Sequence, residues 1–232
     1  MTDYSNVESC FLKKSERLPS YPNENLPIIE VQNVYELGQL VAISFLEWVQ
    51  SNPTGVIALP TGRTPEYFIK TMDRYRSSWS APETKSELTR LGFDYKSTFP
   101  DTSQLKFVML DEFFPMSTAH RNSFCNYVRN FYLKPLGIKD ENVIDFDLVK
   151  HGVITEEDML VFENIDVDLS LLDKKKGGSK EVENQRRILR AVQDYCDSVE
   201  EKIRSEYNGI GFFLGGIGPD GHVAFNQQDQ PL

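Results

Sequence analysis

The chain has 232 residues, of which 40% are hydrophobic and 12% aromatic, which is enough for a substantial core and argues against disorder. A formal net charge of −10 argues against nucleic acid or an anionic membrane as the main partner. A phosphorylated substrate remains possible, because backbone N–H groups and one or two cations can hold a phosphate in an acidic protein.

The cysteines give no sign of a metal site or a disulfide framework. Cys10, Cys125 and Cys196 are far apart, and none forms a CxxC pair, so we expect three reduced thiols. No stretch has the composition of a signal peptide or the ~20 apolar residues of a membrane span. These features predict a soluble, cytoplasmic protein with no membrane partner and no metal.

Residues 1–26 are polar and contain Pro19 and Pro22, which indicates an N-terminal extension. After them, short apolar runs alternate with longer helical patterns. The runs predicted as strands are residues 27–31, 55–59, 105–110, 142–146 and 210–214. Several are continuously apolar, which is typical of parallel strands covered on both faces.

Helices with recognisable starts lie between these runs. Asn33 is a predicted N-cap for a helix whose buried stripe would be Val34, Leu37, Val41, Phe45 and Trp48. Thr64 and Pro65 predict the start of a second helix, and Ser123 that of a third with Phe124, Tyr127 and Phe131 inward. The longest pattern covers about 185–207.

The alternation predicts an α/β fold with a doubly wound, mainly parallel sheet flanked by helices, in a Rossmann-like three-layer arrangement. We expect one domain over residues 27–232, with insertions near 77–103 and 147–184. In such a sheet the ligand binds beyond the carboxyl ends of the strands, so residues that directly follow the apolar runs are the candidates for a site.

The first such segment is LPTGRTP, residues 59–65. A glycine turn before a helix offers free N–H groups and a positive dipole end to a phosphate or carboxylate. Thr61, Gly62 and Thr64 would supply donors, and Arg63 a charge. An ordinary strand-to-helix turn is an equally open interpretation.

The second segment is LDEFF, residues 110–114. Asp111 and Glu112 form an adjacent carboxylate pair at the mouth of a buried strand, where one of them would suit a general base. A cap that points to solvent is the alternative.

The third segment is GGIGPDGHVAFN, residues 215–226. Gly216 and Gly218 permit close approach of a ligand to the backbone. The turn at residues 219–221 would hold Asp220 near His222, and a histidine with a nearby carboxylate suits acid–base chemistry.

These three segments, together with RNSFCNYVRNFYLKPLGI at residues 121–138, resemble the glucosamine-6-phosphate deaminase (isomerase) family. The resemblance covers most of residues 27–226, and the third segment is its most specific part. It implies conversion of glucosamine 6-phosphate to fructose 6-phosphate and ammonia, without a metal or organic cofactor.

The resemblance also implies roles for single residues. His222 would assist ring opening with Asp220 orienting it, and Asp111 would move a proton from C2 to C1. Gly62, Arg63 and Thr64 would hold the phosphate. Beside these roles, Thr61, Glu112, Gly216 and Gly218 are candidate substrate-binding residues from their places at the strand ends. Family members usually carry Glu where this chain has Gln227, a neutral amide at a catalytic position.

Other functions remain open at this level. The GPDGH segment with its proline is also typical of 6-phosphogluconolactonases, and a third possibility is a non-catalytic domain that binds a sugar phosphate. The family continues well past residue 232, so we expect this chain to lack its C-terminal part. A small-molecule sugar phosphate is the expected partner, and a homo-oligomer is left open.

Overall fold

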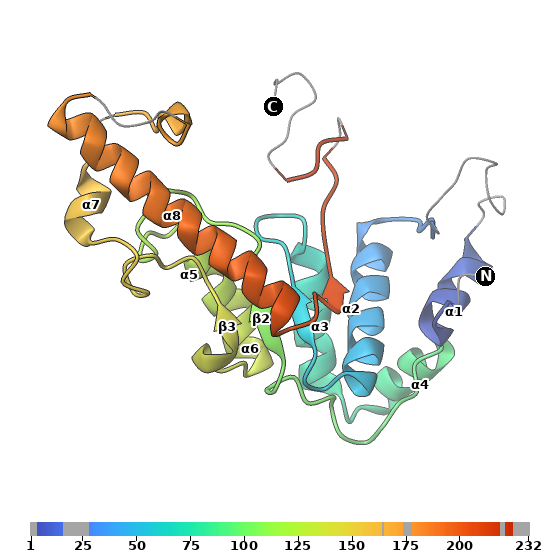
Figure 1. Cartoon of the computed structure of the whole chain (residues 1–232). Coiled ribbons are helices and arrows are strands. Elements are labelled where there is room, and N and C mark those ends of the chain that lie inside the picture. Colours follow the sequence, from blue (N-terminus) through green and yellow to red (C-terminus); the bar gives the residue numbers. More distant parts are fainter. Residues whose placement is uncertain (1–3, 16–27, 164, 174–177, 219–220, 225–232) are drawn as a thin grey trace.

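The computed structural model describes residues 4–15, 28–163, 165–173, 178–218 and 221–224 (Figure 1). Asp220 and Gln227 lie outside the described residues. Within this part of the chain, no helix has the length and apolar character that crossing a membrane requires.

Four parallel strands form the central sheet, in the order β3-β2-β1-β4. Their bounds are Val56–Ala58 for β1, Lys106–Val108 for β2, Val143–Ile144 for β3 and Phe212–Phe213 for β4. Each lies within a run that the sequence predicted as a strand, so these four predictions are confirmed. Residues 28–31 are not a strand, and here the prediction is wrong: Ile29 and Val31 pack partly buried against the core as irregular backbone leading into a helix.

The helices surround this sheet (Figure 1). The α-helices are α1 Asn6–Lys14, α2 Val34–Ser51, α3 Glu66–Ser78, α4 Pro82–Arg90, α5 Phe124–Val128, α6 Lys134–Leu136, α7 Glu156–Leu160 and α8 Lys180–Ser205. A π-helical turn, η1 Arg129–Leu133, joins α5 to α6, and short 3₁₀ turns are η2 Asp140–Asn142 and η3 Leu169–Leu171.

Alternate residues of the strands face different helical layers, as the pleat of a strand requires. Ile57 and Phe107 pack into the core formed with α2, α3 and α5. Val56, Val108 and Ile144 face the opposite way and pack against Val199 and its neighbours on α8. Helices therefore cover both faces of the sheet, which confirms the predicted three-layer α/β fold.

Two predicted buried faces were wrong in detail. Val34 and Leu37 of α2 are 50% and 47% exposed, because Gly38, on an adjoining side of the helix, sits against the backbone of Tyr67 and determines which side meets α3. Phe131 is 47% exposed while Tyr132 is buried. The π-helical turn at η1 holds one extra residue, which shifts the buried face by one position.

The segments expected as an extension and as insertions are structured where described. In α1, Val7 and Phe11 are fully buried and join the main core, together with Leu88 of α4. Residues 154–172 and the first part of α8 build a separate apolar cluster around Phe162 and Ile188. This second cluster lies on the carboxyl side of β3, where it shapes the surroundings of the β2 loop.

Candidate functional site

The strand order defines where a ligand crevice is expected. The chain adds β2 and β3 on one side of β1 and then β4 on the other, so the order reverses between β1 and β4. In open parallel sheets, ligands bind at this topological switch point, outside the carboxyl ends of the strands. The segments that follow β1, β2 and β4, which contain Gly62, Asp111 and Gly216, all leave from this one edge.

The turn after β1 is open and rich in available donors. Gly62 has φ +80°, and a Cβ at this position would meet no atom within 4 Å, so the turn faces open space. Among the described residues, no acceptor is bonded to the backbone N–H groups of Thr61, Gly62, Arg63 or Thr64. The predicted cap at Thr64 is wrong: α3 begins at Glu66, and Pro65 occupies the N-cap position.

The β1 and β4 loops touch each other at the switch point. A Cβ on Gly216 would lie 2.9 Å from Cγ2 of Thr64, closer than real contacts allow. A side chain at residue 216 would therefore push the two loops apart. Glycine at this position keeps the backbone of the β4 loop beside the turn of the β1 loop.

Helix α5 and the turn after it fasten the β1 loop from its other side. The hydroxyl of Tyr127 donates to the carbonyl oxygen of Gly62 at 2.9 Å, and that of Tyr132 donates to the carbonyl oxygen of Pro60 at 2.6 Å. Tyr132 is buried, and burial holds the pKa of its phenol far above the ordinary value, so it stays a neutral donor.

Glu112 joins the β2 loop to the same helix. Its carboxylate accepts from Ser123 Oγ at 2.6 Å, Cys125 N at 2.8 Å, Phe124 N at 3.1 Å and its neighbour Phe113 N at 2.8 Å. Burial alone would raise the pKa of Glu112, but these hydrogen bonds together lower it below the ordinary 4.5. Glu112 is thus an ionised cap on the N-terminus of α5.

The environment of Asp111 raises its pKa, in contrast to that of Glu112. It is half-buried, and its pKa is raised above the ordinary 3.8, first by burial and then by the nearby charge of Glu112. No described residue donates a hydrogen bond to it. Two adjacent carboxylates are therefore separated chemically: Glu112 is held as an anion, and Asp111 is the more basic of the two.

The β4 loop folds back on itself around His222. Ile217 and Val223 form an antiparallel bridge, and the Gly218 N–H donates to the His222 carbonyl at 2.9 Å. A Cβ on Gly218 would lie 2.1 Å from Cε1 of the His222 ring, so only glycine leaves room for this packing. Asp220 and Gln227, the two other predicted catalytic residues of this segment, lie outside the described residues.

Contacts therefore connect the β4, β1 and β2 loops in series, through Thr64, Tyr127 and Glu112. This series links the turn after β1, Gly216 and the carboxylate pair. It includes no contact between the side chains of Asp111 and His222. Among the described residues, no group of three or more His, Cys, Asp or Glu side chains is arranged to hold a metal ion.

The sequence analysis missed one acidic residue at the end of a strand. Asp145 follows β3 and is buried, where it contacts Lys150 Nζ at 2.8 Å and His151 Nε2 at 2.6 Å. Burial alone would raise its pKa, but these partners and the N–H of Asp147 lower it. The signal was available, because Asp145 and Asp147 directly follow an apolar strand just as Asp111 does.

Comparisons with known proteins show which proteins this chain is similar to. No family model matches the sequence. A mouse protein named glucosamine-6-phosphate deaminase 2 is 27% identical over 176 residues, which cover 76% of this chain and 42% of the relative. The glucosamine-6-phosphate deaminase of Alkaliphilus oremlandii is 27% identical over 206 residues, covering 88% of this chain and 61% of the relative.

A solved structure, described as a monomeric glucosamine-6-phosphate deaminase of the NagB superfamily, matches with a TM-score of 0.54 and 19% identity. The match covers 89% of this chain and 61% of that one, and it supports the fold. The chain thus spans roughly two-fifths to three-fifths of the length of these relatives. In sequence the chain is similar to proteins named glucosamine-6-phosphate deaminase, and its fold is similar to that of a solved member of the NagB superfamily.

Proposed function

We propose that this chain binds glucosamine 6-phosphate at the carboxyl edge of its sheet and acts in its conversion to fructose 6-phosphate and ammonia. The observation that carries the proposal is the contact of Thr64 with Gly216 at the switch point, with the Asp111 loop fastened to the same turn through α5. The relatives named glucosamine-6-phosphate deaminase support the same substrate class.

The turn after β1 is the proposed phosphate site. Its unbonded N–H groups at Gly62, Arg63 and Thr64 precede the 13-residue helix α3, whose dipole favours an anion at this end. The guanidinium of Arg63 adds a positive charge on the exposed side of the turn. This arrangement lets an acidic protein hold a phosphate without a cluster of basic residues.

Proton transfer is the proposed task of the other two loops. The C2 proton of the sugar becomes acidic only in the open-chain form, so one group must open the ring and another must act as base. His222, oriented by Asp220, would move the proton that ring opening requires. Asp111 would then take the proton from C2 and return it at C1.

The carboxyl environment of Asp111 suits this role. Its raised pKa makes it a stronger base than an ordinary aspartate, while the low pKa of Glu112 keeps the second carboxylate out of the proton transfer. Return of the proton at C1 leaves an imine at C2, and water then hydrolyses this imine to the ketone with release of ammonia. These steps need only proton-transferring side chains and water.

A product assay tests the proposal. The chain is incubated with glucosamine 6-phosphate, and ammonia and fructose 6-phosphate are measured separately; a parallel reaction follows acid release from 6-phosphogluconolactone. We expect ammonia and fructose 6-phosphate in equal amounts. Acid release from the lactone alone, or sugar-phosphate binding without any product, would contradict it.

A further inference from the structure

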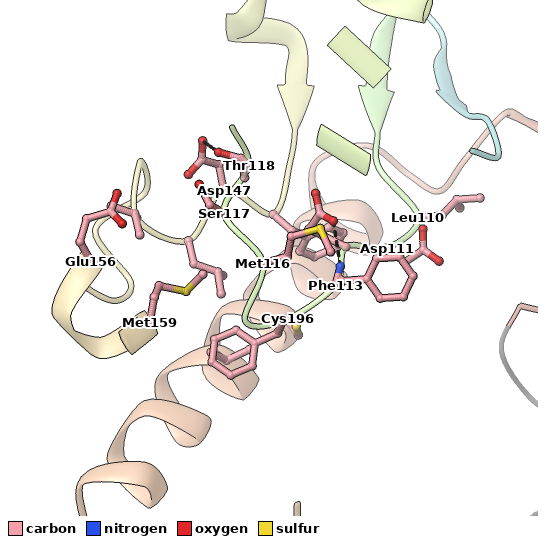
Figure 2. A pocket seen from close by; sticks show the side chains of 16 residues that line it. Leu110, Asp111, Phe113, Met116, Ser117, Thr118, Asp147, Glu156, Met159 and Cys196 are labelled. Carbon is pink, nitrogen blue, oxygen red and sulfur yellow. Dashed lines mark hydrogen bonds between the residues drawn. The ribbon is translucent and has the colours of Figure 1, made fainter. Parts of the chain in front are cut away.

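A pocket of about 240 Å³ lies at the loops that follow β2 and β3, on the opposite side of β1 from β4. Figure 2 shows the side chains that line it. Its walls are the loop after β2, the loop after β3, α7 and α8. It shares Asp111 and Glu112 with the proposed active site, but its other lining residues belong to the loops after β2 and β3, to α7 and to α8, whereas the proposed phosphate turn follows β1.

Most of the pocket wall is apolar and easily polarised. Phe114 and Phe146 provide aromatic rings, Met116 and Met159 provide thioethers, and Val192 of α8 closes one side. Such a lining favours a flat or flexible apolar body, and aromatic faces also attract a cation. The volume suits a single ring with a short chain.

The charges in the wall all have one sign. Four carboxylates line the pocket, those of Asp111, Glu112, Asp147 and Glu156, and none of the lining residues is Lys, Arg or His. Glu112 is satisfied by α5, and Asp147 accepts from Thr118 Oγ1 at 2.9 Å and Lys150 N at 3.1 Å.

Two carboxylates in the wall therefore remain without a donor among the described residues. Asp111 and Glu156 lie at opposite ends of the group of side chains in Figure 2, with Met116 and Met159 between them. Asp111 is half-buried, so its carboxylate gains more from a positive partner than it would in water, whereas Glu156 is exposed and gains less. A phosphate group would be repelled here, which favours a cationic ligand without a phosphate.

We propose that the pocket binds an organic cation, an ammonium group carried on an apolar body of about one ring. The apolar part would lie against the phenylalanines and methionines, and the ammonium would pair with Glu156 or Asp111. The proposal rests on the pocket and not on the proposed reaction. Its test is therefore a binding measurement on the whole chain.

Calorimetry with 2-phenylethylammonium and the neutral, similarly shaped 2-phenylethanol separates charge recognition from simple apolar burial. We expect the cation to bind roughly fivefold to thirtyfold more tightly than the alcohol, the range expected for partly to fully desolvated cation contacts. Equal affinity for the two probes, or no binding of either, would overturn the proposal.

Two neighbouring glutamates of α7 supply a matched pair of variants. Both are exposed, but Glu156 lines the pocket and Glu157 does not. Glu156→Gln should weaken 2-phenylethylammonium binding about twofold to fivefold and leave 2-phenylethanol unchanged, while Glu157→Gln should change neither. Identical effects of the two variants would show that only the general negative charge of the protein attracts the probe.

Cys196 reports where the probe binds. It lines the pocket, while Cys10 lies on α1 and makes its hydrogen bond to Arg90 instead. Saturating 2-phenylethylammonium should slow alkylation of Cys196 by iodoacetamide and leave that of Cys10 unchanged, as measured by mass spectrometry. Unchanged alkylation of Cys196 under saturation would place the probe elsewhere and refute the assignment of this pocket.

Discussion

At the scale of single residues, Asp111 and Glu112 differ because of what each touches. The carboxylate of Glu112 is enclosed by donors from the start of α5, so it remains an anion. The carboxyl of Asp111 is half-buried and lies near the negative charge of Glu112, and both factors favour its protonated form. The sequence shows two adjacent acids, but only the contact with Ser123 and Cys125 distinguishes them.

The pH at which activity falls on the acid side of the pH–activity profile, the acid limb, should therefore depend on Glu112. Asp111 must be ionised to act as base, so activity is lost as pH falls through its raised pKa. Glu112→Gln removes one of the two causes of that elevation, and the acid limb should move to lower pH. The pH dependence of kcat/KM measures this shift.

Ser123→Ala is the matched control for this prediction. It removes one donor to Glu112 and loosens the cap of α5, but it keeps the negative charge beside Asp111. We expect lower stability with a smaller shift of the acid limb than in Glu112→Gln. Equal shifts in the two variants would mean that the cap, and not the charge, sets the pKa of Asp111.

Tyr127 is predicted to affect substrate binding, because it positions the proposed phosphate turn. Tyr127→Phe removes the hydrogen bond to the Gly62 carbonyl, which costs about 1 kcal/mol of positioning energy, or about a fivefold change in affinity. KM for the sugar phosphate should rise by about that factor with little change in kcat. A fall in kcat at constant KM would show that Tyr127 acts on the chemical step and not on the turn.

At the scale of elements, helix α2 shows a tertiary contact overriding a local preference. Alanine normally stabilises a helix interior by about 1 kcal/mol over glycine. At Gly38, however, a Cβ would lie 2.6 Å from the carbonyl carbon of Tyr67, and overpacking costs about 1–3 kcal/mol. The close approach of α2 to α3 depends on this glycine.

Gly38→Ala should consequently destabilise the protein, by up to about 2 kcal/mol after the helix preference is subtracted. Urea unfolding followed by circular dichroism measures the change. A gain of about 1 kcal/mol, the outcome expected from helix propensity alone, would contradict the packing described here.

The strands were easier to predict from the sequence than the buried faces of the helices. The four strands were predicted because uninterrupted apolar runs need no knowledge of their partners. The buried face of α2 was missed at Val34 and Leu37, because apolar spacing does not reveal that a glycine contact chooses the face. The exposure of Phe131 was not predicted, because hydrophobic periodicity gives no sign of a π-helical turn.

At the scale of the whole molecule, topology gathers residues that the sequence separates. Gly62, Asp111 and Gly216 are far apart along the chain, yet the parallel sheet brings the loops that hold them to one edge. Looking directly after each apolar run was enough to select these three segments. The same rule would also have selected Asp145, whereas the role of Glu112 as a cap required knowledge of which loop and helix pack together.

The second apolar cluster is also a property of the whole molecule. Residues 154–172 pack against α8 and bring α7 to the β2 loop, where Phe114 meets Phe162 at 5.2 Å between ring centroids. From the sequence this region was predicted to be part of an insertion near residues 147–184. In the structure it forms a wall of the pocket beside Asp111.

Exchange of the C2 proton tests the central claim most directly. Glucosamine 6-phosphate is incubated with the chain in D₂O, and deuterium incorporation is followed by NMR for the wild type and for Asp111→Asn. We predict incorporation with the wild type and a loss of about 10²- to 10⁴-fold in its rate with Asp111→Asn, at nearly unchanged sugar-phosphate affinity. Exchange at the wild-type rate in Asp111→Asn, or no exchange with the wild type, would contradict the account.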